Sequence, residues 1–458
     1  MRYVSTRGSA PELGFADALL AGLAVDGGLY VPAEWPAVAP VEAGRPYAET
    51  AAAIMARYVG EDIPRPALEA ICRDAYATFR HPAVCPLVQL GDDEWLLELF
   101  HGPTLAFKDV ALQVVGRLFD HVLAERGSRL TVVGATSGDT GSSAIAALAG
   151  RANVEVVILY PKGRVSEIQR RQMTTVDAPN VRTAAIDGTF DDCQDLVKAM
   201  FADAPFRQDL RLAAVNSINW ARVMAQTVYY ATAAASLGSR TVTFAVPTGN
   251  FGNVLAGWIA GRGGAPIRRL VVGSNRNDIL TRFLDTSVMS TAAVVPTLSP
   301  SMDIQVSSNF ERLLFEMNGR DGGLTAEQLH TFRSSGRLSV EPDQVAAWLA
   351  PTFRAASLDD EATLAVMRDV WRESGHLLDP HTAVGLGAGR RWREDGVATI
   401  ALGTAHPAKF PEAVEAATGV RPGLPPHLSD LFDRPERVVE LPDDLAAVER
   451  FVASTARV

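Results

Sequence analysis

The spacing of apolar positions divides the chain into an N-terminal stretch of mixed character and a longer stretch of alternating strands and helices. Residues 13–24 carry apolar side chains at helical spacing and run into an Asp-Gly-Gly turn at 26–28. The apolar run at 29–31, just before a proline, favours a short strand. Residues 48–79 have the periodicity of one or two further helices. This N-terminal stretch carries no group of side chains of a catalytic type.

From about residue 96 the pattern changes to short, continuously apolar runs rich in β-branched residues. Segments with a period of 3.6 residues separate these runs, for example 142–148 and 220–235. Continuous apolar strands between helices are typical of parallel sheets that helices cover on both faces. Residues 320–375 are more charged and helical, and 445–453 predict a closing helix. The predicted strands are 130–133, 154–160, 181–186, 242–246, 270–272 and 398–402.

We therefore predict an α/β protein with two doubly wound, three-layer parallel-sheet domains. Two sheets are expected because one sheet with this many crossovers would be large for a single core. The expected parts are an N-terminal region at 1–95, a first α/β part at 96–240 and a second at 241–458.

Composition narrows the class of protein. The net charge of −10 argues against nucleic acid or an anionic membrane as the main partner. The three cysteines, Cys72, Cys85 and Cys193, have no metal-ligand spacing, so we expect a reducing compartment and no metal site. The sequence shows no secretory signal and no apolar run of membrane-spanning length, so we expect a cytoplasmic protein.

One lysine stands out in the segment LLELFHGPTLAFKDV at 96–110. Of 43 basic residues only four are lysines, and Lys108 lies just after an expected strand and a Gly-Pro break. A desolvated lysine can lose its proton and form a Schiff base, whereas arginine can do neither. The alternative is an ordinary surface lysine, which is the more frequent case for lysines in general.

The segment TGNFGN, residues 248–253, connects an expected strand to an expected helix. Glycines in such a turn let the backbone approach a phosphate, and the helix N-terminus adds a partial positive charge. The spacing is neither that of a nucleotide P-loop nor that of a dinucleotide fold, which indicates a compact phosphate group. The alternative is a tight strand–helix turn without a ligand.

Two further loops have the same strand-to-helix position. ATSGDTGSS at 135–143 combines hydroxyls with a helix start, which suits a carboxylate or a second phosphate, although capping explains one of the hydroxyls. GTAHPAKF at 403–410 places Thr404 at the carboxyl end of a strand, where a hydroxyl could bind a heterocyclic nitrogen. Lys409 and His406 in this loop are equally compatible with helix-start or surface positions.

These features together fit pyridoxal phosphate. Lys108 would hold its aldehyde, the 248–253 loop its phosphate, and Thr404 its ring nitrogen. A carboxylate partner would keep that nitrogen protonated, whereas a threonine hydroxyl does not. The pattern thus favours elimination and replacement chemistry over transamination.

Six segments, in order, resemble the threonine synthases of the shorter bacterial and fungal type: HGPTLAFKD, ATSGDTGSS, YPKGRVSEIQRRQM, NSINWARVMAQ, PTGNFGN and TAHPAKF. YVSTRG and DGGLYVP near the N-terminus are similar to the same family, so the resemblance covers essentially the whole chain. The family belongs to the tryptophan-synthase-β-like, fold type II group of pyridoxal phosphate enzymes. The resemblance implies conversion of O-phospho-L-homoserine and water to L-threonine and phosphate, by γ-elimination and β-addition of water, in a monomer.

The resemblance also implies roles for single residues. Lys108 is expected to be the Schiff-base lysine and, once free, the base that moves the Cα and Cβ protons, with Phe107 helping to desolvate it. Thr404 is the expected ring-nitrogen ligand. The expected ligands of the cofactor phosphate are Gly249, Asn250, Phe251, Gly252 and Asn253.

The substrate needs partners of its own. The loop expected to grip the substrate carboxylate consists of Ser137, Gly138, Asp139 and Thr140. For the substrate phosphate we expect Asn219 and Arg222, with Lys162 and Arg164 as further candidates, because arginine binds phosphate oxygens as a fork and lysine as a point charge. For a helical arginine, a structural ion pair is at least as common as a ligand role.

Other functions compatible with this pattern are those of a phospholyase or a serine/threonine dehydratase, which differ in their products. A catalytically idle relative that serves as a binding module is a further alternative, but intact Lys108, the 248–253 loop and Thr404 argue against it. A nucleotide-binding protein is excluded by the missing phosphate-loop spacings.

Overall fold

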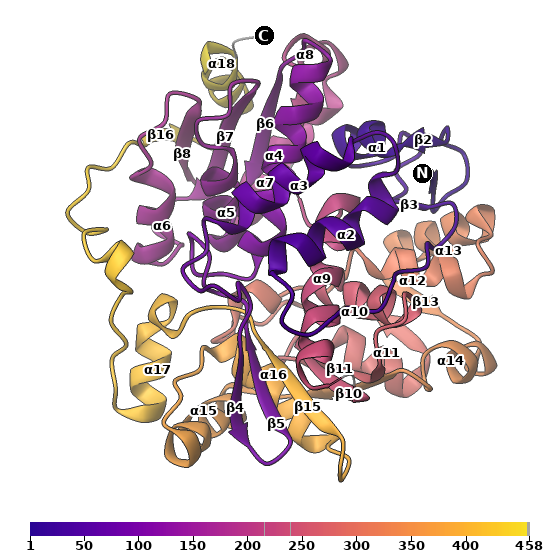
Figure 1. The fold of residues 1–458 in the computed structure, drawn as a ribbon. Helices are drawn as coiled ribbons and strands as arrows, with labels where there is room; N and C mark the ends of the chain where they lie inside the picture. Colours follow the sequence, from indigo (N-terminus) through magenta and orange to yellow (C-terminus); the bar gives the residue numbers. More distant parts are fainter. Residues whose placement is uncertain (215, 239, 456–458) are drawn as a thin grey trace.

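Two large sheets form two lobes in the computed structural model, which describes residues 1–214, 216–238 and 240–455. In Figure 1 the five-stranded sheet lies in the upper lobe and the six-stranded sheet in the lower lobe. The strands of the five-stranded sheet are all parallel, and β4 (Leu87–Gly91) is the one antiparallel strand of the described six-stranded sheet. The predicted α/β fold with two parallel sheets is confirmed.

The five-stranded sheet has the order β16-β8-β7-β6-β9, and its central strands β6 and β7 are buried on both faces. Its strands are β6 (Leu130–Ala135), β7 (Val154–Pro161), β8 (Val181–Asp187), β9 (Leu212–Ala213) and β16 (Val439–Pro442). Val132 and Val156 point into the main core, while their neighbours Val133 and Val157 pack on the opposite face. Because successive side chains face opposite ways and both faces are covered, the central strands β6 and β7 are mostly apolar.

Helices cover both faces of this sheet. Helices α7 and α18 pack on one face, and α4 and α5 lie on the other. The helices of this lobe are α4 (Lys108–Glu125), α5 (Asp139–Leu148), α6 (Glu167–Thr174), α7 (Phe190–Ala202), α8 (Ala204–Asp209) and α18 (Leu445–Thr455).

The six-stranded sheet has the order β14-β11-β10-β15-β5-β4. Its other strands are β5 (Glu94–Glu98), β10 (Val242–Pro247), β11 (Ile267–Ser274), β14 (Phe353–Ser357) and β15 (Ala398–Gly403). Phe244 and Val246 face the main core beside α9 and α10, and Ala245 faces the core under α15, α16 and α17. These helices are α9 (Trp220–Ser236), α10 (Gly252–Arg262), α15 (Asp360–Ser374), α16 (Pro380–Arg391) and α17 (Pro411–Thr418).

The N-terminal region packs beside both lobes: α1, β2 and β3 lie at the upper right of Figure 1, and α2 and α3 cross its middle. Its helices contact α4 and α9, and its three-stranded antiparallel sheet has the order β2-β1-β3. The elements are β1 (Arg2–Ser5), β2 (Leu13–Gly14), α1 (Phe15–Ala21), β3 (Tyr30–Pro32), α2 (Tyr47–Val59) and α3 (Arg65–Tyr76). The predicted early helices and the short strand are confirmed.

The remaining elements lie between β11 and α15. They are α11 (Ile279–Thr286), β12 (Val288–Ser290), α12 (Phe310–Met317), α13 (Gly322–Ser335), β13 (Arg337–Ser339) and α14 (Pro342–Trp348). The charged segment 320–375, expected to be helical, also contains the edge strand β14, whose short sequence FRAAS has no continuous apolar run.

Neither of the two large sheets is built from one continuous stretch of the sequence. Strand β5, near the start of the expected first α/β part, pairs with β15 in the six-stranded sheet. Strand β16, near the end of the chain, pairs with β8 in the five-stranded sheet. In Figure 1 the C-terminal segment runs up the left side from the lower to the upper lobe. No helix in the described ranges is both long and apolar enough to span a membrane.

Candidate active site

Three neighbouring strands of the six-stranded sheet end at the same edge. Strand β15 lies between β10 and β5, and all three run parallel. The segment that leads to Lys108 follows β5, Thr404 follows β15, and the 248–251 loop follows β10. Since ligands bind at the carboxyl ends of parallel strands, this topology places the three predicted cofactor contacts side by side.

Backbone hydrogen bonds fasten the Lys108 loop to the loop after β15. The Phe107 N–H donates to the Thr404 carbonyl at 2.8 Å, and the His406 N–H donates to the Leu105 carbonyl at 3.0 Å. Helix α4 begins at Lys108. The partial positive charge of a helix N-terminus disfavours the ammonium form of an amine at this position.

The next residue, Asp109, closes the loop that precedes α4. Its buried carboxylate accepts hydrogen bonds at 2.7 Å from the Thr104 N–H and at 2.7 Å from the Thr104 hydroxyl. That hydroxyl also lies 2.8 Å from the Ser143 hydroxyl, at the start of α5. Burial raises the pKa of Asp109, and the hydrogen bonds from Thr104 act in the opposite direction.

Lys108 is almost enclosed. Its side chain is 11% exposed, and its Nζ lies 3.4 Å from Asp139 Oδ2 and 5.8 Å from the centre of the Phe107 ring. Burial lowers the pKa of the Lys108 amine; Asp139 opposes this effect, while the cationic groups of Lys409 and Arg222 lower the pKa further. The net direction is toward the free base, the form a nucleophile or a general base requires.

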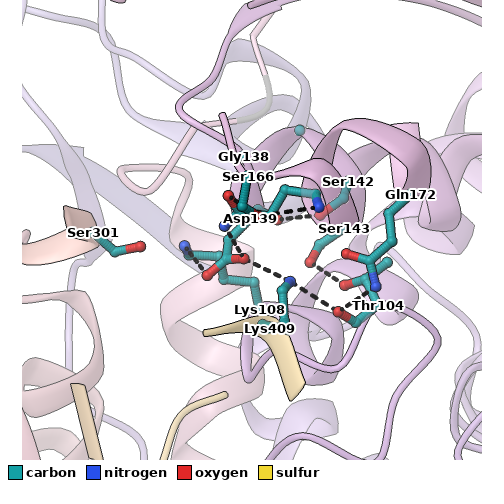
Figure 2. Close-up of polar contacts among 12 residues, drawn as sticks. Thr104, Lys108, Gly138, Asp139, Ser142, Ser143, Ser166, Gln172, Ser301 and Lys409 are labelled. Atoms are coloured by element: carbon teal, nitrogen blue, oxygen red, sulfur yellow. Dashed lines mark hydrogen bonds and ion pairs between the residues drawn. The ribbon is translucent and has the colours of Figure 1, made fainter. Parts of the chain in front are cut away.

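A second lysine lies in the same site. Lys409 is fully buried, and its Nζ lies 2.6 Å from Asp139 Oδ1 and donates to the Thr104 carbonyl at 2.9 Å. Figure 2 shows the side-chain nitrogens of Lys108 and Lys409 approaching the Asp139 carboxylate from different directions. His406 and Lys409 do stand at a helix start, a 3₁₀ turn at Pro407–Lys409, but the surface position considered for Lys409 is wrong. The scarcity of lysine that drew attention to Lys108 applies equally to Lys409.

The segment between β6 and α5 forms a tight loop around Thr136. The Thr136 hydroxyl oxygen accepts from the N–H groups of Gly138 and Gly141 at 3.0 and 2.9 Å. Gly138 has φ = 139°, a backbone conformation that side-chain-bearing residues rarely adopt. The Asp139 carboxylate accepts from Gln169 Nε2 at 2.9 Å. Burial would raise the pKa of Asp139, but the ammonium groups of Lys409 and Lys108 hold it well below its usual range.

The 248–251 loop is held from outside its own helix. Phe251 has φ = 62°, a left-handed conformation, and its buried ring packs at 5.5 Å from the Phe310 ring. Asn309 Nδ2 donates to the Asn250 carbonyl at 3.0 Å. A Cβ at Gly249 would lie 3.0 Å from the Ser301 carbonyl oxygen, so a larger residue here would press against the backbone of the facing segment. The loop then leads into α10 at Gly252.

Two buried polar groups here have no hydrogen-bond partner among the described residues: the Thr404 hydroxyl and Asn253 Nδ2. The Asn253 amide orientation is fixed because its Oδ1 accepts from the hydroxyls of Tyr229 and Tyr230 at 2.6 and 2.9 Å. Groups of this kind are costly to bury unless a ligand completes them.

Thr404 is ordered by the buried carboxylate of Asp379, a residue that no local sequence pattern singles out. Its N–H donates to the Thr382 hydroxyl oxygen at 3.0 Å, and that hydroxyl donates to Asp379. Asp379 also lies 2.9 Å from His381 Nδ1, and His381 Nε2 accepts from the Ser301 N–H at 3.2 Å. One aspartate therefore orders both the residue after β15 and the segment against Gly249.

The residues predicted for the substrate phosphate differ in their surroundings. Asn219 caps α9 through Ala221 and donates to the Leu19 carbonyl at 2.9 Å, so both ends of its amide are engaged. Arg222 is 4% exposed, and its Nε and Nη1 have no partner in the described part of the chain. Burial lowers the pKa of Arg222 to about 10. Lys162 is half exposed and paired with Glu440 at 2.7 Å on the surface.

Comparison with known proteins agrees with the cofactor site that this geometry indicates. Residues 84–401 match the family model for pyridoxal-phosphate dependent enzymes. Residues 2–76 match the model for the threonine synthase N terminus, and 382–452 that for its C-terminal part. The threonine synthase of Pseudomonas aeruginosa is 54% identical over 99% of this chain and 98% of its own. The chain belongs to the threonine synthase family.

Solved structures of threonine synthases have the same fold. The crystal structure of a pyridoxal-phosphate-bound threonine synthase from Brucella melitensis has a TM-score of 0.98 at 50% identity and covers 100% of both chains. The yeast threonine synthase structure has a TM-score of 0.93 at 39% identity, over 99% of this chain and 98% of that one. The free Thr404 hydroxyl, the Asn253 amide and the glycine-lined loop fit pyridoxal phosphate, the cofactor of this family.

Proposed function

We propose that this protein converts O-phospho-L-homoserine and water to L-threonine and phosphate. The proposal is carried by one observation: in a chain 54% identical to a threonine synthase, Lys108, the 248–253 loop and Thr404 meet at one sheet edge. The reaction balances, since the phosphate leaves with its bridging oxygen and water supplies the new hydroxyl.

Pyridoxal phosphate supplies an electron sink for the carbons next to the substrate amine. Lys108 would hold it, with the Phe107 ring against the lysine. The backbone N–H groups of the loop from Gly249 to Asn253, at the start of α10, would bind the cofactor phosphate together with the free Asn253 amide. The free Thr404 hydroxyl would take the ring nitrogen. Because a hydroxyl leaves that nitrogen neutral, this arrangement supports elimination and replacement.

Two parts of the site would hold the substrate, one at its carboxylate and the other at its phosphate. The 137–140 loop would bind its carboxylate through Ser137 and Thr140, because the Asp139 carboxylate is itself negative and faces lysines. Arg222 would bind its phosphate, because its buried guanidinium has no partner among the described side chains. Asn219, predicted as a ligand of the substrate phosphate, would instead position Arg222 by capping the start of α9.

Lys108 would act as the base that moves the Cα and Cβ protons of the bound substrate. Burial lowers the pKa of its amine, which is the direction that a general base near neutral pH requires. Substitution Lys108→Ala should abolish both turnover and covalent attachment of the cofactor; substantial turnover in this variant would disprove the assignment.

We further propose that the protein works in the cytoplasm as a monomer, without nucleic acid or membrane partners. The net charge of −10 and the three buried cysteine thiols support this setting. Light scattering behind a sizing column should give a mass near 49.0 kDa; twice that mass would contradict the monomer.

The decisive experiment incubates the purified holoenzyme with O-phospho-L-homoserine and measures phosphate and threonine together. Equal amounts of the two products are expected. Phosphate with 2-oxobutyrate and ammonia, but without threonine, would make the protein a phospholyase. Neither product, from protein that carries its cofactor, would favour a dehydratase or a binding module.

A further inference from the structure

The Lys409 side chain is a buried charge that the proposed reaction does not use. It is 0% exposed, whereas the surface pair Lys198–Asp195 has side chains 69% and 72% exposed. Burying an ammonium group is costly unless it is paired and hydrogen-bonded. Lys409 meets that condition through Asp139 and the Thr104 carbonyl.

The two lysines compete for one carboxylate, and the distances decide the competition. Lys409 Nζ lies 2.6 Å from Asp139 Oδ1, and Lys108 Nζ lies 3.4 Å from Oδ2. Charge-assisted N–H···O bonds are normally about 2.7–2.9 Å long, so Lys409 holds the tight ion pair and Lys108 only a weak one. Gln169 donates to the same Oδ1 at 2.9 Å and fixes the orientation of the carboxylate.

We propose that Lys409 is a positioning residue of the active site: it holds the Asp139 carboxylate away from Lys108, so that the Lys108 amine stays available as a free base. The inference builds on the proposed function, because that function gives Lys108 its role as a base.

The charges around Lys108 set the direction of the effect. Asp139 favours the ammonium form of Lys108, while Lys409 and Arg222 disfavour it. Without the Lys409 charge, Lys108 would be the nearest cation to Asp139. The positive charge that repels the Lys108 ammonium would also be gone. Both changes favour the Lys108 ammonium, so its pKa rises. Asp109, the other buried carboxylate nearby, is satisfied by Thr104.

Lys409 also makes the proposed carboxylate-binding loop less negative. Its positive charge neutralises Asp139, which lies in the loop proposed to bind the substrate carboxylate. Without that neutralisation, the substrate carboxylate would face the uncompensated carboxylate of Asp139, whose side chain is only 6% exposed, and like charges at close range destabilise each other strongly when they are buried.

The test titrates the lysines directly in the full-length, cofactor-free protein by NMR after labelling with ¹³C-lysine. The chain has only four lysines, so the spectrum is simple, and Lys162→Arg and Lys198→Arg assign the surface signals. In Lys409→Met the titration midpoint of Lys108 should rise by about one pH unit or more. Lys198→Met, which removes a surface lysine, should leave that midpoint unchanged. An unchanged Lys108 midpoint in folded Lys409→Met overturns the proposal.

A second variant decides the matter if Lys409→Met does not fold. In Asp139→Asn the Lys108 midpoint should fall, and the Lys409 signal should shift because its ion partner is gone. A Lys409 signal that does not respond to Asp139→Asn overturns the proposal. Because this readout needs neither substrate nor turnover, it stays separate from the outcome of the product assay.

Discussion

At the scale of single residues, the active site is marked by buried polar groups whose partners the protein does not supply. The Thr404 hydroxyl, Asn253 Nδ2 and the Arg222 guanidinium are of this kind in the described chain. Neighbouring groups such as Asp109 and Asp379 are fully engaged instead. This contrast separates side chains that await a ligand from those that hold the site together.

The contrast gives a first prediction, for Thr404→Val. Valine has nearly the same shape and removes an unsatisfied hydroxyl, so the cofactor-free protein should keep its free energy of unfolding or gain stability. Cofactor affinity and turnover should both fall, turnover by about tenfold or more. Thr382→Val is the control: its hydroxyl is bonded to Asp379, so the variant should lose about 1–3 kcal/mol of stability by chemical denaturation. Equal stability losses in the two variants would contradict the distinction.

His406 gives a second prediction, on the pH dependence of stability. Burial, with help from His101, lowers its pKa from 6.5 to about 4. Between these pH values the unfolded chain binds a proton that the native protein does not, so the free energy of unfolding decreases as the pH falls. The contribution is at most about 1.4 kcal/mol per pH unit.

Replacing His406 with asparagine should remove this contribution. Asparagine preserves an acceptor for the Ala408 N–H that His406 now caps. Denaturant unfolding between pH 7 and 4 should therefore show a shallower loss of stability in His406→Asn. The same replacement at the exposed His330 should leave the slope as in the parent protein, and an unchanged slope in both variants would refute the prediction.

At the scale of elements, the site depends on where helices begin. Helices α4, α5 and α10 begin at Lys108, Asp139 and Gly252, so three helix N-termini border the site. Helix N-termini favour anions and disfavour ammonium groups. They thus support both the binding of phosphate and carboxylate groups and a free amine on Lys108.

The start of α4 gives a third prediction, for Asp109→Asn. The Asp109 carboxylate accepts one hydrogen bond from the Thr104 N–H and one from the Thr104 hydroxyl. In asparagine an NH₂ group would replace one of the two accepting oxygens, so one of these hydrogen bonds would be lost. The free energy of unfolding should decrease by about 1–3 kcal/mol, and turnover should fall because Lys108 is the preceding residue. Asp195→Asn, at a surface ion pair, should change stability by less than about 1 kcal/mol. Wild-type stability and turnover in Asp109→Asn would show that the loop does not depend on this carboxylate.

At the scale of the whole molecule, ion pairs and hydrogen bonds connect the N-terminal region to helix α12, which lies next to the cofactor loop. Arg7 forms a two-point ion pair with Glu311 at 3.1 Å for both bonds, and Thr6 donates to the same carboxylate at 2.6 Å. Arg312, fully buried, donates to the carbonyls of Tyr30 and Ile218. The N-terminal region, which has no catalytic side chains, therefore supports α12, whose N-cap residue Asn309 holds the Asn250 carbonyl.

This connection gives a fourth prediction. Glu311→Gln leaves Arg7 without its counter-charge in a largely buried position, which should cost about 3–5 kcal/mol of unfolding free energy. Glu69→Gln breaks the pair with Arg65 at 2.6 Å, where both side chains are about half exposed, and should cost less than about 1 kcal/mol. Similar losses in the two variants, measured by denaturant unfolding, would refute a structural role for the buried pair.

The sequence predicted most of this arrangement because its signals are local. Continuous apolar strands and glycine-bearing turns at their ends depend only on neighbouring residues, so the strand ends at Thr404 and Gly249 could be found. The ion pair of Lys409 with Asp139 joins residues 270 positions apart and leaves no local pattern. The membership of β5 and β16 in distant sheets is likewise a long-range property.

The separation of β5 from β15 has a consequence for biosynthesis. Strand β5 ends at Glu98 and its neighbour β15 begins at Ala398. At about 5–20 residues per second, a ribosome needs about 15–60 s to translate the intervening stretch. During that interval Lys108 follows a strand, β5, whose parallel partner does not yet exist. The catalytic edge can therefore form only late in translation, once the loop after β15 has left the exit tunnel.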